Sequence, residues 1–555
     1  MYNLLIGGAA GQGIDTTAAI LEKLLKRSGY YVYTVRDFMS RIRGGHNFSL
    51  LRFGPEPITS HSYKLDGIIA MNDESIELHL AELKDGGFIL CDSKLSTDDP
   101  RAIKVPMDEM AKAIGNPRVA GSVAVGVLLK LFGEPLDYME EVLRSFVKGA
   151  FIEVNVKAIA QGYEATAQRY SRQAGDFSGS MIVSGNRALA LGAIAAGLKF
   201  YSAYPMSPST TILEYLSAKS EQAGIVVEQA EDEIAAINMA IGASYAGARA
   251  MTGTSGGGFS LMVEALGLSG MAEIPLVVAD IQRPGPVTGL PTRTEQSDLK
   301  FVISASQGEF PRMVVALRDH ADAFYQTARA FALAEKYQIP VLILSDQYLG
   351  DASATVPPFN PDSIVERPVG DAATDGEYLR YRLTPDGISP RLLPGITTHL
   401  VSADSDEHDE LGRITESAEV RNAMMDKRMG KLKLLEADLL EPEFIGVEGC
   451  ATLLIGWGST RGPIAEAVRI MNEAEPGSCG ALCFGDVFPL PKKLLLEKAP
   501  KACEVIGVEQ NATAQFAGLV RELTGIEFTR NILKYDGRQI SGEEIAERAR
   551  KGADR

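Results

Sequence analysis

Short apolar runs alternate along the chain with longer segments whose apolar residues recur at helical spacing. At the start, the run Tyr2–Ile6 leads into the glycine-rich turn Gly7–Gly13 and then into the amphipathic segment Ile14–Arg27. A second apolar run, Tyr31–Val35, follows. This order of strand, turn, helix and strand predicts that the chain opens with an α/β domain.

The same alternation continues through the middle of the chain. The segment Ser184–Leu198 is rich in alanine and glycine, so it predicts a helix that approaches another helix or a ligand closely. Purely apolar strands between helices are typical of a parallel sheet that is covered on both faces, so we expect a multidomain α/β protein. The strands predicted here are Gly224–Glu228, Arg249–Thr252, Ile274–Ala279 and Val341–Leu344.

Breaks in this pattern divide the chain into four parts. A first domain is expected over residues 1–175, where it ends in the polar stretch Arg169–Gly179, and a second over residues 181–350. Residues 351–440 predict a connector, which is rich in Pro, Asp and Gly at first and then contains a charged helix. Residues 441–555 predict a last α/β domain.

Composition and charge narrow the possible functions. The 555 residues carry a formal net charge of −17, which disfavours a general nucleic-acid surface. The longest apolar run, Leu189–Leu198, is too short to span a bilayer, and Met1–Gly13 is interpreted as a first strand because it has no basic leader. We therefore expect a soluble cytoplasmic protein. The five cysteines are scattered and form no Cys-x-x-Cys pair, which predicts reduced, mostly buried thiols and no metal site.

Two loops near the start of the chain suit an anionic ligand. The glycine turn Gly7–Gly13 can present backbone amides at a helix N-terminus, although it is also consistent with a tight turn alone. Ser40–His46 carries two arginines beside a glycine pair, which suits phosphate recognition, although an exposed basic turn is equally consistent. Together they predict a site for a phosphorylated cofactor, at Gly11, Gln12, Gly13, Ser40, Arg41, Arg43, Gly44 and Gly45.

Three segments in the middle of the chain carry further candidate chemistry. Tyr204–Thr211 combines two prolines with several hydroxyls, but it could simply cap the next helix. Glu231-Asp232-Glu233 precedes an alanine-rich helix and a glycine-rich loop, an order that suits contact with a buried heterocycle as well as ordinary helix stabilisation. Gly285–Leu299 fixes Arg293, which can clamp a carboxylate or pair with a nearby acid.

In this order, the motifs resemble the α subunit of the 2-oxoacid:acceptor oxidoreductase family, with the family's γ domain fused in front. The resemblance covers nearly the whole chain. Its most specific parts are Tyr204–Ser209 and Gly285–Thr292, and it extends to Glu407–Gly412, Asp426–Arg428 and Val508–Asn511. It implies a γ domain over residues 1–175, a thiamine diphosphate pyrimidine-binding domain over 181–350, and a domain similar to the last domain of transketolase over 441–555.

The resemblance also implies an activity. A 2-oxoacid:ferredoxin oxidoreductase uses thiamine diphosphate and coenzyme A to convert an oxoacid to an acyl-CoA and carbon dioxide, passing electrons to ferredoxin, and it also runs in reverse. The resemblance favours 2-oxoglutarate as substrate, with pyruvate and branched-chain oxoacids as alternatives. A hypothesis from another class is a non-catalytic subunit that binds coenzyme A or a nucleotide as a scaffold.

Site residues follow from the matching positions. Glu233 corresponds to the family glutamate that activates the aminopyrimidine ring, with Glu231 as the second candidate. Tyr204 and Ser207 belong to the substrate motif, where the family has threonine in place of Ser207. Arg293 corresponds to an arginine linked to recognition of the substrate carboxylate. The γ domain is similar to the coenzyme A site of these enzymes, which assigns an anionic ligand to the two N-terminal loops.

Some parts that the reaction needs are absent from the sequence. No Gly-Asp-Gly triplet occurs, and no set of cysteines suits an iron–sulfur cluster. The resemblance implies that a β subunit carries the Mg²⁺ that anchors the diphosphate and a 4Fe-4S cluster. We therefore expect an assembly of two αβ pairs, with thiamine diphosphate shared between the chains and ferredoxin as the electron acceptor.

Overall fold

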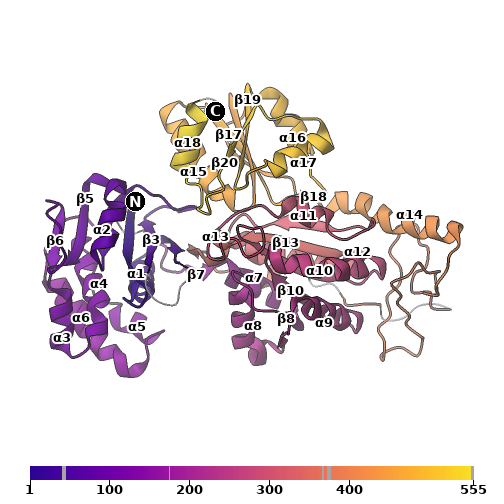
Figure 1. The fold of residues 1–555 in the computed structure, drawn as a ribbon, viewed down its shortest axis with the longest axis horizontal. Coiled ribbons are helices and arrows are strands. Elements are labelled where there is room, and N and C mark those ends of the chain that lie inside the picture. The colour runs from indigo at the N-terminus through magenta and orange to yellow at the C-terminus, as the bar shows by residue number, and fades with distance from the viewer. Residues whose placement is uncertain (40–44, 174, 366–367, 372–376, 552–555) are drawn as a thin grey trace. The chain divides into compact units, whose positions relative to one another are not determined.

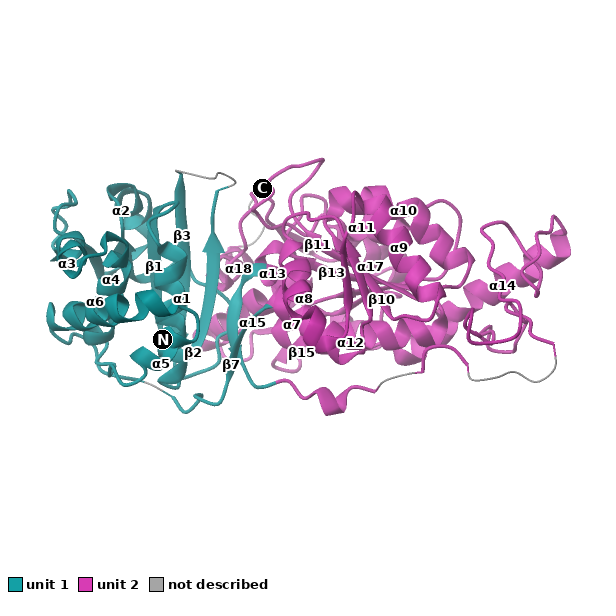
Figure 2. Ribbon diagram, turned by 90° about the horizontal axis from the view of Figure 1, so that it is seen from below, with its two compact units in different colours: residues 1–184, 351–358 teal, residues 185–350, 359–555 magenta. Residues whose placement is uncertain are grey.

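The computed structural model describes residues 1–555 except 40–44, 174, 366–367, 372–376 and 552–555. The chain forms two compact units (Figure 2): unit 1 contains residues 1–184 and 351–358, and unit 2 contains residues 185–350 and 359–555. Within the described parts, no helix is both long enough and apolar enough to cross a membrane. The α/β architecture expected from the sequence is confirmed.

Unit 1 is built on an eight-stranded mixed sheet of order β6-β5-β4-β1-β3-β2-β14-β7. Helices α1 and α3 to α6 share one apolar core on one face of the sheet, and α2 packs on the other face (Figure 1). The elements before residue 165 are β1 (Tyr2–Ala9), α1 (Ile14–Arg27), β2 (Tyr31–Asp37), β3 (His46–Gly54), β4 (Leu65–Ala70), α2 (Asp73–His79), β5 (Leu83–Asp92), β6 (Ala102–Val105), α3 (Met107–Ile114), α4 (Ala120–Leu131), α5 (Met139–Arg144) and α6 (Ile152–Glu164).

The sheet of unit 1 extends beyond the boundary expected at residue 175. Strand β7 (Met181–Ser184) pairs with β14 (Ser353–Val356), and β14 pairs antiparallel with β2. The hydroxyl oxygen of Thr355 accepts a hydrogen bond from the backbone N–H of Val32 at 2.9 Å. The expected second domain and connector therefore each give a strand to unit 1, because β2 would otherwise leave a row of backbone groups unpaired.

Unit 2 contains a seven-stranded sheet of order β18-β12-β13-β11-β10-β8-β9, which is parallel except for β18. Helices α9, α10 and α11 share an apolar core with β10, β11, β12 and β13. The elements are α7 (Gly185–Ala195), β8 (Phe200–Ala203), α8 (Thr210–Ala223), β9 (Val226–Gln229), α9 (Glu233–Tyr245), β10 (Ala250–Thr254), α10 (Gly256–Met271), β11 (Leu276–Gln282), α11 (Leu299–Ser304), β12 (Met313–Ala316), α12 (His320–Tyr337), β13 (Pro340–Asp346) and α13 (Gln347–Asp351).

The C-terminal part of unit 2 has its own five-stranded sheet, of order β15-β17-β16-β19-β20. Figure 1 shows α15 and α18 on one side of this sheet and α16 and α17 on the other. Its elements are β15 (Glu443–Gly446), β16 (Thr452–Trp457), α15 (Arg461–Ala474), β17 (Cys479–Phe484), β18 (Asp486–Phe488), α16 (Lys493–Lys498), β19 (Glu504–Glu509), α17 (Gln515–Thr524), β20 (Arg530–Leu533) and α18 (Gly542–Arg550).

The two sheets of unit 2 share one hydrophobic core. Strand β18 follows β17 but pairs antiparallel with β12 of the other sheet. Trp457, Phe484 and Phe516 of the C-terminal part pack in the same core as the residues of α9 and α10. Arg329 also binds both carboxylate oxygens of Asp486, at 2.7 and 2.8 Å. The C-terminal part is therefore fixed against the seven-stranded sheet.

Helix α14 (Ala418–Leu435) is held by buried ion pairs. Lys427 and Lys431 both bind the carboxylate of Glu273, which is 1% exposed. Arg428 donates to Glu407 at 2.7 Å. Two segments that carry the family resemblance, Glu407–Gly412 and Asp426–Arg428, therefore contact each other, and these residues hold the framework of the connector.

The small residues of α7 allow close approach to another helix. A Cβ at Gly192 would stand 2.2 Å from the carbonyl oxygen of Phe324 on α12. Of the two alternatives that the sequence leaves open for this helix, close packing against a helix is the one observed at Gly192. The contact leaves no room for a methyl group, because backbone atoms cannot move aside as a flexible side chain can.

Gly192→Ala should therefore lower the thermal stability of the protein, with a free-energy cost of about 1–3 kcal/mol for overpacking. The measurement is the melting temperature of the purified variant. Gly430→Ala on α14 is the matched control, since no atom lies within 4 Å of its added Cβ and alanine favours the helix. Equal melting temperatures for the two variants would contradict the close contact.

Candidate functional site

The candidate residues of unit 2 gather at the carboxyl edge of the seven-stranded sheet. Tyr204–Ser209 follows β8, Glu233 begins α9 after β9, and Ser255–Gly258 follows β10. Parallel strands end at the same edge, which is where α/β proteins bind ligands. Three motifs that are separate in the sequence therefore converge at one edge.

Glu233 is the buried acid of the Glu231-Asp232-Glu233 segment. Asp232 caps α9 by accepting a hydrogen bond from the N–H of Ala235 at 2.8 Å, which turns the Glu233 side chain inward. Glu233 is 3% exposed and its Oε1 has no hydrogen-bond partner, whereas Glu231 is exposed. A buried carboxylate oxygen without a partner is costly, so the geometry favours Glu233 over Glu231 as the group that meets a ligand.

Gly258, on the first turn of α10, leaves the space in which Glu233 lies. A Cβ at this position would stand 2.5 Å from Oε1 of Glu233 and 2.1 Å from the hydroxyl oxygen of Thr254. Any other residue would push the carboxylate away. The glycine-rich loop after β10 thus keeps room for the acid.

These features fit the aminopyrimidine ring of thiamine diphosphate. A ring nitrogen that shares a proton with Oε1 would supply the partner that this buried oxygen lacks. Glu233 is therefore the residue that would hold the ring. The described residues include no cluster of three or more His, Cys, Asp or Glu side chains that could hold a metal ion.

The Tyr204–Ser209 loop is fixed by bonds to its backbone. The Asn186 side chain donates to the carbonyl of Pro208 at 2.9 Å, and Ser209 donates its hydroxyl to the carbonyl of Met206 at 2.7 Å. Ser209 precedes α8 without capping it through its side chain, so the capping alternative for this motif is wrong. Tyr204 and Ser207 are left exposed at the sheet edge, where they can contact a ligand.

Arg283 is a site residue that the sequence did not single out. It directly follows β11, and its guanidinium donates to the carbonyl of Ser207 at 2.6 Å, joining the loops after β8 and β11. Burial lowers the pKa of Arg283 from its ordinary value, while nearby Asp298 opposes that shift. The available signal was its position shortly after the predicted strand Ile274–Ala279, since loops that follow parallel strands carry ligand-binding residues.

Arg293 lies in a loop that the C-terminal part of unit 2 holds in place. Thr294 donates its backbone N–H to the carbonyl of Gly537 at 3.1 Å, and a Cβ on Gly537 would meet the Cβ of Arg293 at 3.0 Å. Gln296, which is fully buried, donates to the carbonyl of Trp457 and accepts from the backbone N–H of Gln510. The described contacts thus place Arg293 against the C-terminal part, and its role toward a substrate stays a prediction.

The segment Val508–Asn511 explains how that part holds the loop. Glu509 is fully buried and accepts hydrogen bonds from the backbone N–H of Phe516 at 2.9 Å and from the side chain of Asn511 at 2.8 Å. Asn511 in turn donates to the carbonyl of Gln296 at 3.2 Å. Glu509 and Asn511 thus connect the start of α17 to the loop that carries Arg293 through hydrogen bonds.

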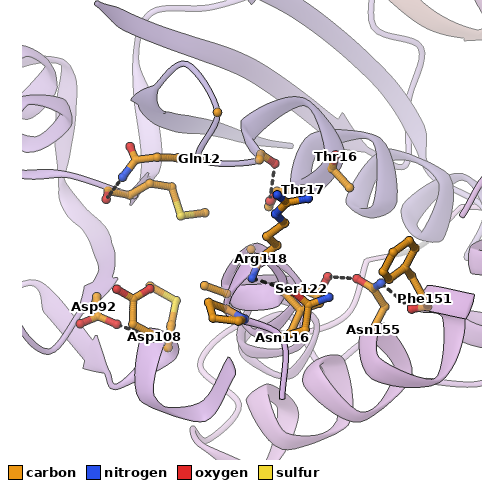
Figure 3. Close-up of a pocket in the computed structure, with 18 of the residues that line it drawn as sticks. Gln12, Thr16, Thr17, Asp92, Asp108, Asn116, Arg118, Ser122, Phe151 and Asn155 are labelled. Atoms are coloured by element: carbon orange, nitrogen blue, oxygen red, sulfur yellow. Dashed lines mark hydrogen bonds between the residues drawn. The ribbon is translucent and has the colours of Figure 1, made fainter. Parts of the chain in front are cut away.

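A second candidate site lies within unit 1 at the glycine turn. A cavity of about 510 Å³ is lined by the start of α1 and by the segment before α4 (Figure 3). Gly11 and Gly13 have φ angles of 95° and 79°, which favour glycine, and no atom lies within 4 Å of a Cβ at either position. Helix α1 has no side-chain cap, so its first amides are open to an anion.

Gln12 and Arg118 have different tasks in this cavity. The Gln12 side chain accepts from the N–H of Ala9 at 2.7 Å and donates to the carbonyl of Met71 at 3.1 Å, so it holds the turn. Arg118 is exposed, and its side chain lines the cavity (Figure 3). Its guanidinium forms no ion pair with any described residue, whereas Lys94 pairs with Asp108.

The basic loop before β3 lies mostly outside the described residues. Four of the predicted residues lie outside the described part of the chain, so their role stays a prediction: Ser40, Arg41, Arg43 and Gly44. Gly45 is described, with a φ of 77° that favours glycine. The cavity itself supplies a cation, Arg118, that the sequence did not indicate, because a single arginine in a loop carries no distinctive pattern.

The cysteines are free thiols. Cys91, Cys450, Cys479 and Cys483 are buried, and Cys503 is exposed. Burial raises the pKa of the Cys479 and Cys483 thiols to about 12, so they stay protonated at neutral pH.

Comparison with known proteins places these features in context. The family model described as pyruvate flavodoxin/ferredoxin oxidoreductase, thiamine diphosphate-binding, matches residues 191–427, and the pyruvate ferredoxin/flavodoxin oxidoreductase model matches residues 3–165. The chain is 34% identical to the 2-oxoacid:ferredoxin oxidoreductase subunit alpha of Sulfolobus sp., over 98% of this chain and 95% of that protein.

Two further relatives carry 2-oxoglutarate in their names. The 2-oxoglutarate oxidoreductase subunit KorA of Mycobacterium tuberculosis is 28% identical, over 97% of this chain and 89% of that protein. A solved structure of 2-oxoglutarate:ferredoxin oxidoreductase from Magnetococcus marinus, with 2-oxoglutarate, coenzyme A and succinyl-CoA bound, matches with a TM-score of 0.94. It is 32% identical, and the match covers 99% of each chain.

Proposed function

The chain belongs to the 2-oxoacid:ferredoxin oxidoreductase family as an α subunit, and we propose that its complex converts 2-oxoglutarate to succinyl-CoA. In this reaction 2-oxoglutarate, coenzyme A and oxidised ferredoxin give succinyl-CoA, carbon dioxide and reduced ferredoxin, reversibly, in the cytoplasm. The observation that carries the catalytic assignment is the buried, unpartnered Oε1 of Glu233. The full-length likeness to the Magnetococcus marinus enzyme supports 2-oxoglutarate over pyruvate and branched-chain oxoacids.

The residues of unit 2 have separate tasks in this proposal. Thiamine diphosphate, when bound, supplies the carbon nucleophile that attacks the oxo carbon. Glu233 holds and returns a proton at Oε1, where the ring nitrogen would lie. The exposed hydroxyl of Ser207 donates a hydrogen bond to the substrate from a loop that Arg283 fixes. Arg293 clamps a carboxylate of the oxoacid.

The outer surface of unit 2 supports a partner chain beside Glu233. Helices α9 and α10 carry apolar residues on all sides, a pattern typical of helices that are buried all round. In the chain alone, Ile234, Met239 and Leu261 are 51%, 41% and 50% exposed. We propose that a β subunit covers this surface and brings Mg²⁺, the diphosphate half of the site and a 4Fe-4S cluster, in an assembly of two αβ pairs.

The cavity of unit 1 suits coenzyme A. The phosphates of coenzyme A would meet the open amides at the start of α1 and the Arg118 guanidinium. Arg41 and Arg43 are expected to add charge at the same ligand. The second candidate function is a scaffold subunit that only binds coenzyme A. Glu233 distinguishes the catalytic subunit from the scaffold, because a scaffold does not require a buried, unpartnered acid.

The substrate assignment is tested with the purified complex, including any chain that co-purifies. Reduction of ferredoxin or of a viologen dye should require coenzyme A and be at least about tenfold faster with 2-oxoglutarate than with pyruvate at equal concentration. Bound thiamine diphosphate, magnesium and iron are measured in the same preparation. Faster reduction with pyruvate would show that the substrate assignment is wrong.

Glu233→Gln should lower kcat by about 10²–10⁴-fold, because the amide cannot exchange a proton with the ring. Size-exclusion chromatography should show the same assembly as the unchanged protein. Glu231→Gln is the matched control and should keep most of the turnover, since Glu231 is exposed. If both variants turn over normally, the scaffold candidate is favoured instead.

Arg118→Ala should raise the KM for coenzyme A about tenfold while the KM for 2-oxoglutarate stays constant, because the loss is one charge-assisted hydrogen bond to a phosphate. Initial rates at varied concentrations of each substrate separate the two constants. Lys112→Ala, which removes an exposed cation from the nearby helix α3, serves as the control for charge alone. A parallel rise in both KM values would count against coenzyme A in this cavity.

A further inference from the structure

Two buried aspartates of unit 2, Asp280 and Asp298, have no task in the proposed reaction. Asp280, on β11, has no exposed surface, and neither of its carboxylate oxygens has a hydrogen-bond partner. Asp298 follows the Arg293 loop, and its Oδ2 is also buried without a partner. A Cβ at Gly256 would stand 2.4 Å from that Oδ2, so the Asp298 carboxylate lies against the first turn of α10.

The register of the sheet puts Asp280 close to the catalytic acid. Asp280 is the strand partner of Thr254 in the parallel pair of β10 and β11, so the two side chains lie on the same face of the sheet. The Thr254 hydroxyl oxygen and Oε1 of Glu233 both lie within 2.5 Å of the position that a Cβ of residue 258 would take. Asp280, Thr254 and Glu233 therefore line one buried polar strip.

Both aspartates are harder to ionise than usual, and the charge of Asp298 contributes to this effect at Asp280. Burial, together with the charge of Asp298, raises the pKa of Asp280 well above its usual range. Burial and the nearby Glu295 raise the pKa of Asp298 to about 7, and Arg283 opposes that shift. The charged groups that act on the pair are thus Glu295 and Arg283, both from the segment after β11.

This arrangement is costly to the fold. Buried carboxylates are normally paired with cations or satisfied by several donors, and replacement by neutral residues is usually favourable. The hydroxyl oxygens of Thr252, on β10, and Ser255, which follows β10, are also fully buried without partners. Costly, unsatisfied groups of this kind cluster where function requires them.

We propose that Asp280 and Asp298 hold one proton between them, and that turnover requires the pair in this singly protonated form. With one proton the pair carries a single charge, which the first turn of α10 stabilises. Loss of that proton would place a second negative charge beside Glu233, which must itself ionise when it gives up its proton. The second half of this proposal rests on the catalytic role proposed for Glu233.

The test uses Asp280→Asn in the protein as purified, because asparagine has the shape of the neutral acid and cannot ionise. Both folded-state pKa values lie above the unfolded value of about 3.9, so the stability linked to this proton is present at low pH and lost as pH rises through the folded values. The melting temperature of the variant should therefore exceed that of the unchanged protein by an amount that grows as pH rises above about 4 and stops growing only above the raised pKa of Asp280.

A matched control is available on the neighbouring strand. Asp346, on β13, is also a buried aspartate with a raised pKa, of about 6, but Ser459 and the backbone N–H of Leu349 donate to it. Asp346→Asn should lower the melting temperature, by an amount that no longer changes above about pH 7. Asp298→Asn provides a second variant of the pair if Asp280→Asn fails to fold.

The pH dependence of turnover tests the second half of the proposal. In Asp280→Asn, the loss of kcat at alkaline pH should move upward by at least about one pH unit, with the KM for the oxoacid unchanged. If Asp280→Asn changes the melting temperature by the same amount at every pH, the two aspartates do not hold a proton between them. If the difference in melting temperature grows with pH but the loss of kcat at alkaline pH does not move, turnover does not require the singly protonated pair. The melting measurements do not depend on which oxoacid is the substrate.

Discussion

Parallel strands present their carboxyl ends at one edge of a sheet only, and the site in unit 2 depends on this constraint. The loops after β8, β10 and β11 and the start of α9 all lie at that edge, although their residues span positions 204–283 of the chain. The edge brings together more polar side chains than the chain itself pairs. Unsatisfied atoms on Glu233, Thr252, Ser255 and Asp280 are the result. The parallel arrangement of the strands alone therefore brings the loops that carry these groups together.

The remainder of unit 2 makes that edge rigid. Strand β18 pairs with β12 across the two sheets, and Gln296 binds backbone groups of both Trp457 and Gln510. Arg283 attaches the loop after β11 to Ser207. The two hydrogen bonds of Gln296 are individually modest, but they are buried, so that breaking one leaves an unsatisfied polar group and costs more than the bond itself contributes. The positions of Ser207 and Arg293 therefore depend on residues far from them in the sequence.

The sequence predicted the strands and helices of both sheets well where apolar runs are long. It also singled out Glu233, with Glu231 as the second candidate, and the Tyr204–Ser209 loop, because motif spacing and the family resemblance agree there; the roles of these residues stay predictions. It did not predict that β14 leaves the connector to join the first sheet, since a four-residue strand in a segment rich in Pro and Asp has no distinctive pattern. Arg283, Arg118 and Asp280 were missed for a related reason: a single charged residue reveals its burial, its orientation and its partners only in three dimensions.

Strands β7 and β14 also set an order of events during synthesis. They are neighbours in the sheet of unit 1, yet residues 185–350, which build most of the second sheet, separate them in the chain. The nascent β2 edge has no strand to pair with until residue 356 has left the ribosome, by which time the whole segment between them has emerged. An unpaired edge is a site for aggregation, so this topology extends the period in which the young chain is vulnerable. The first sheet therefore stays incomplete until six of the seven strands of the second sheet have been translated.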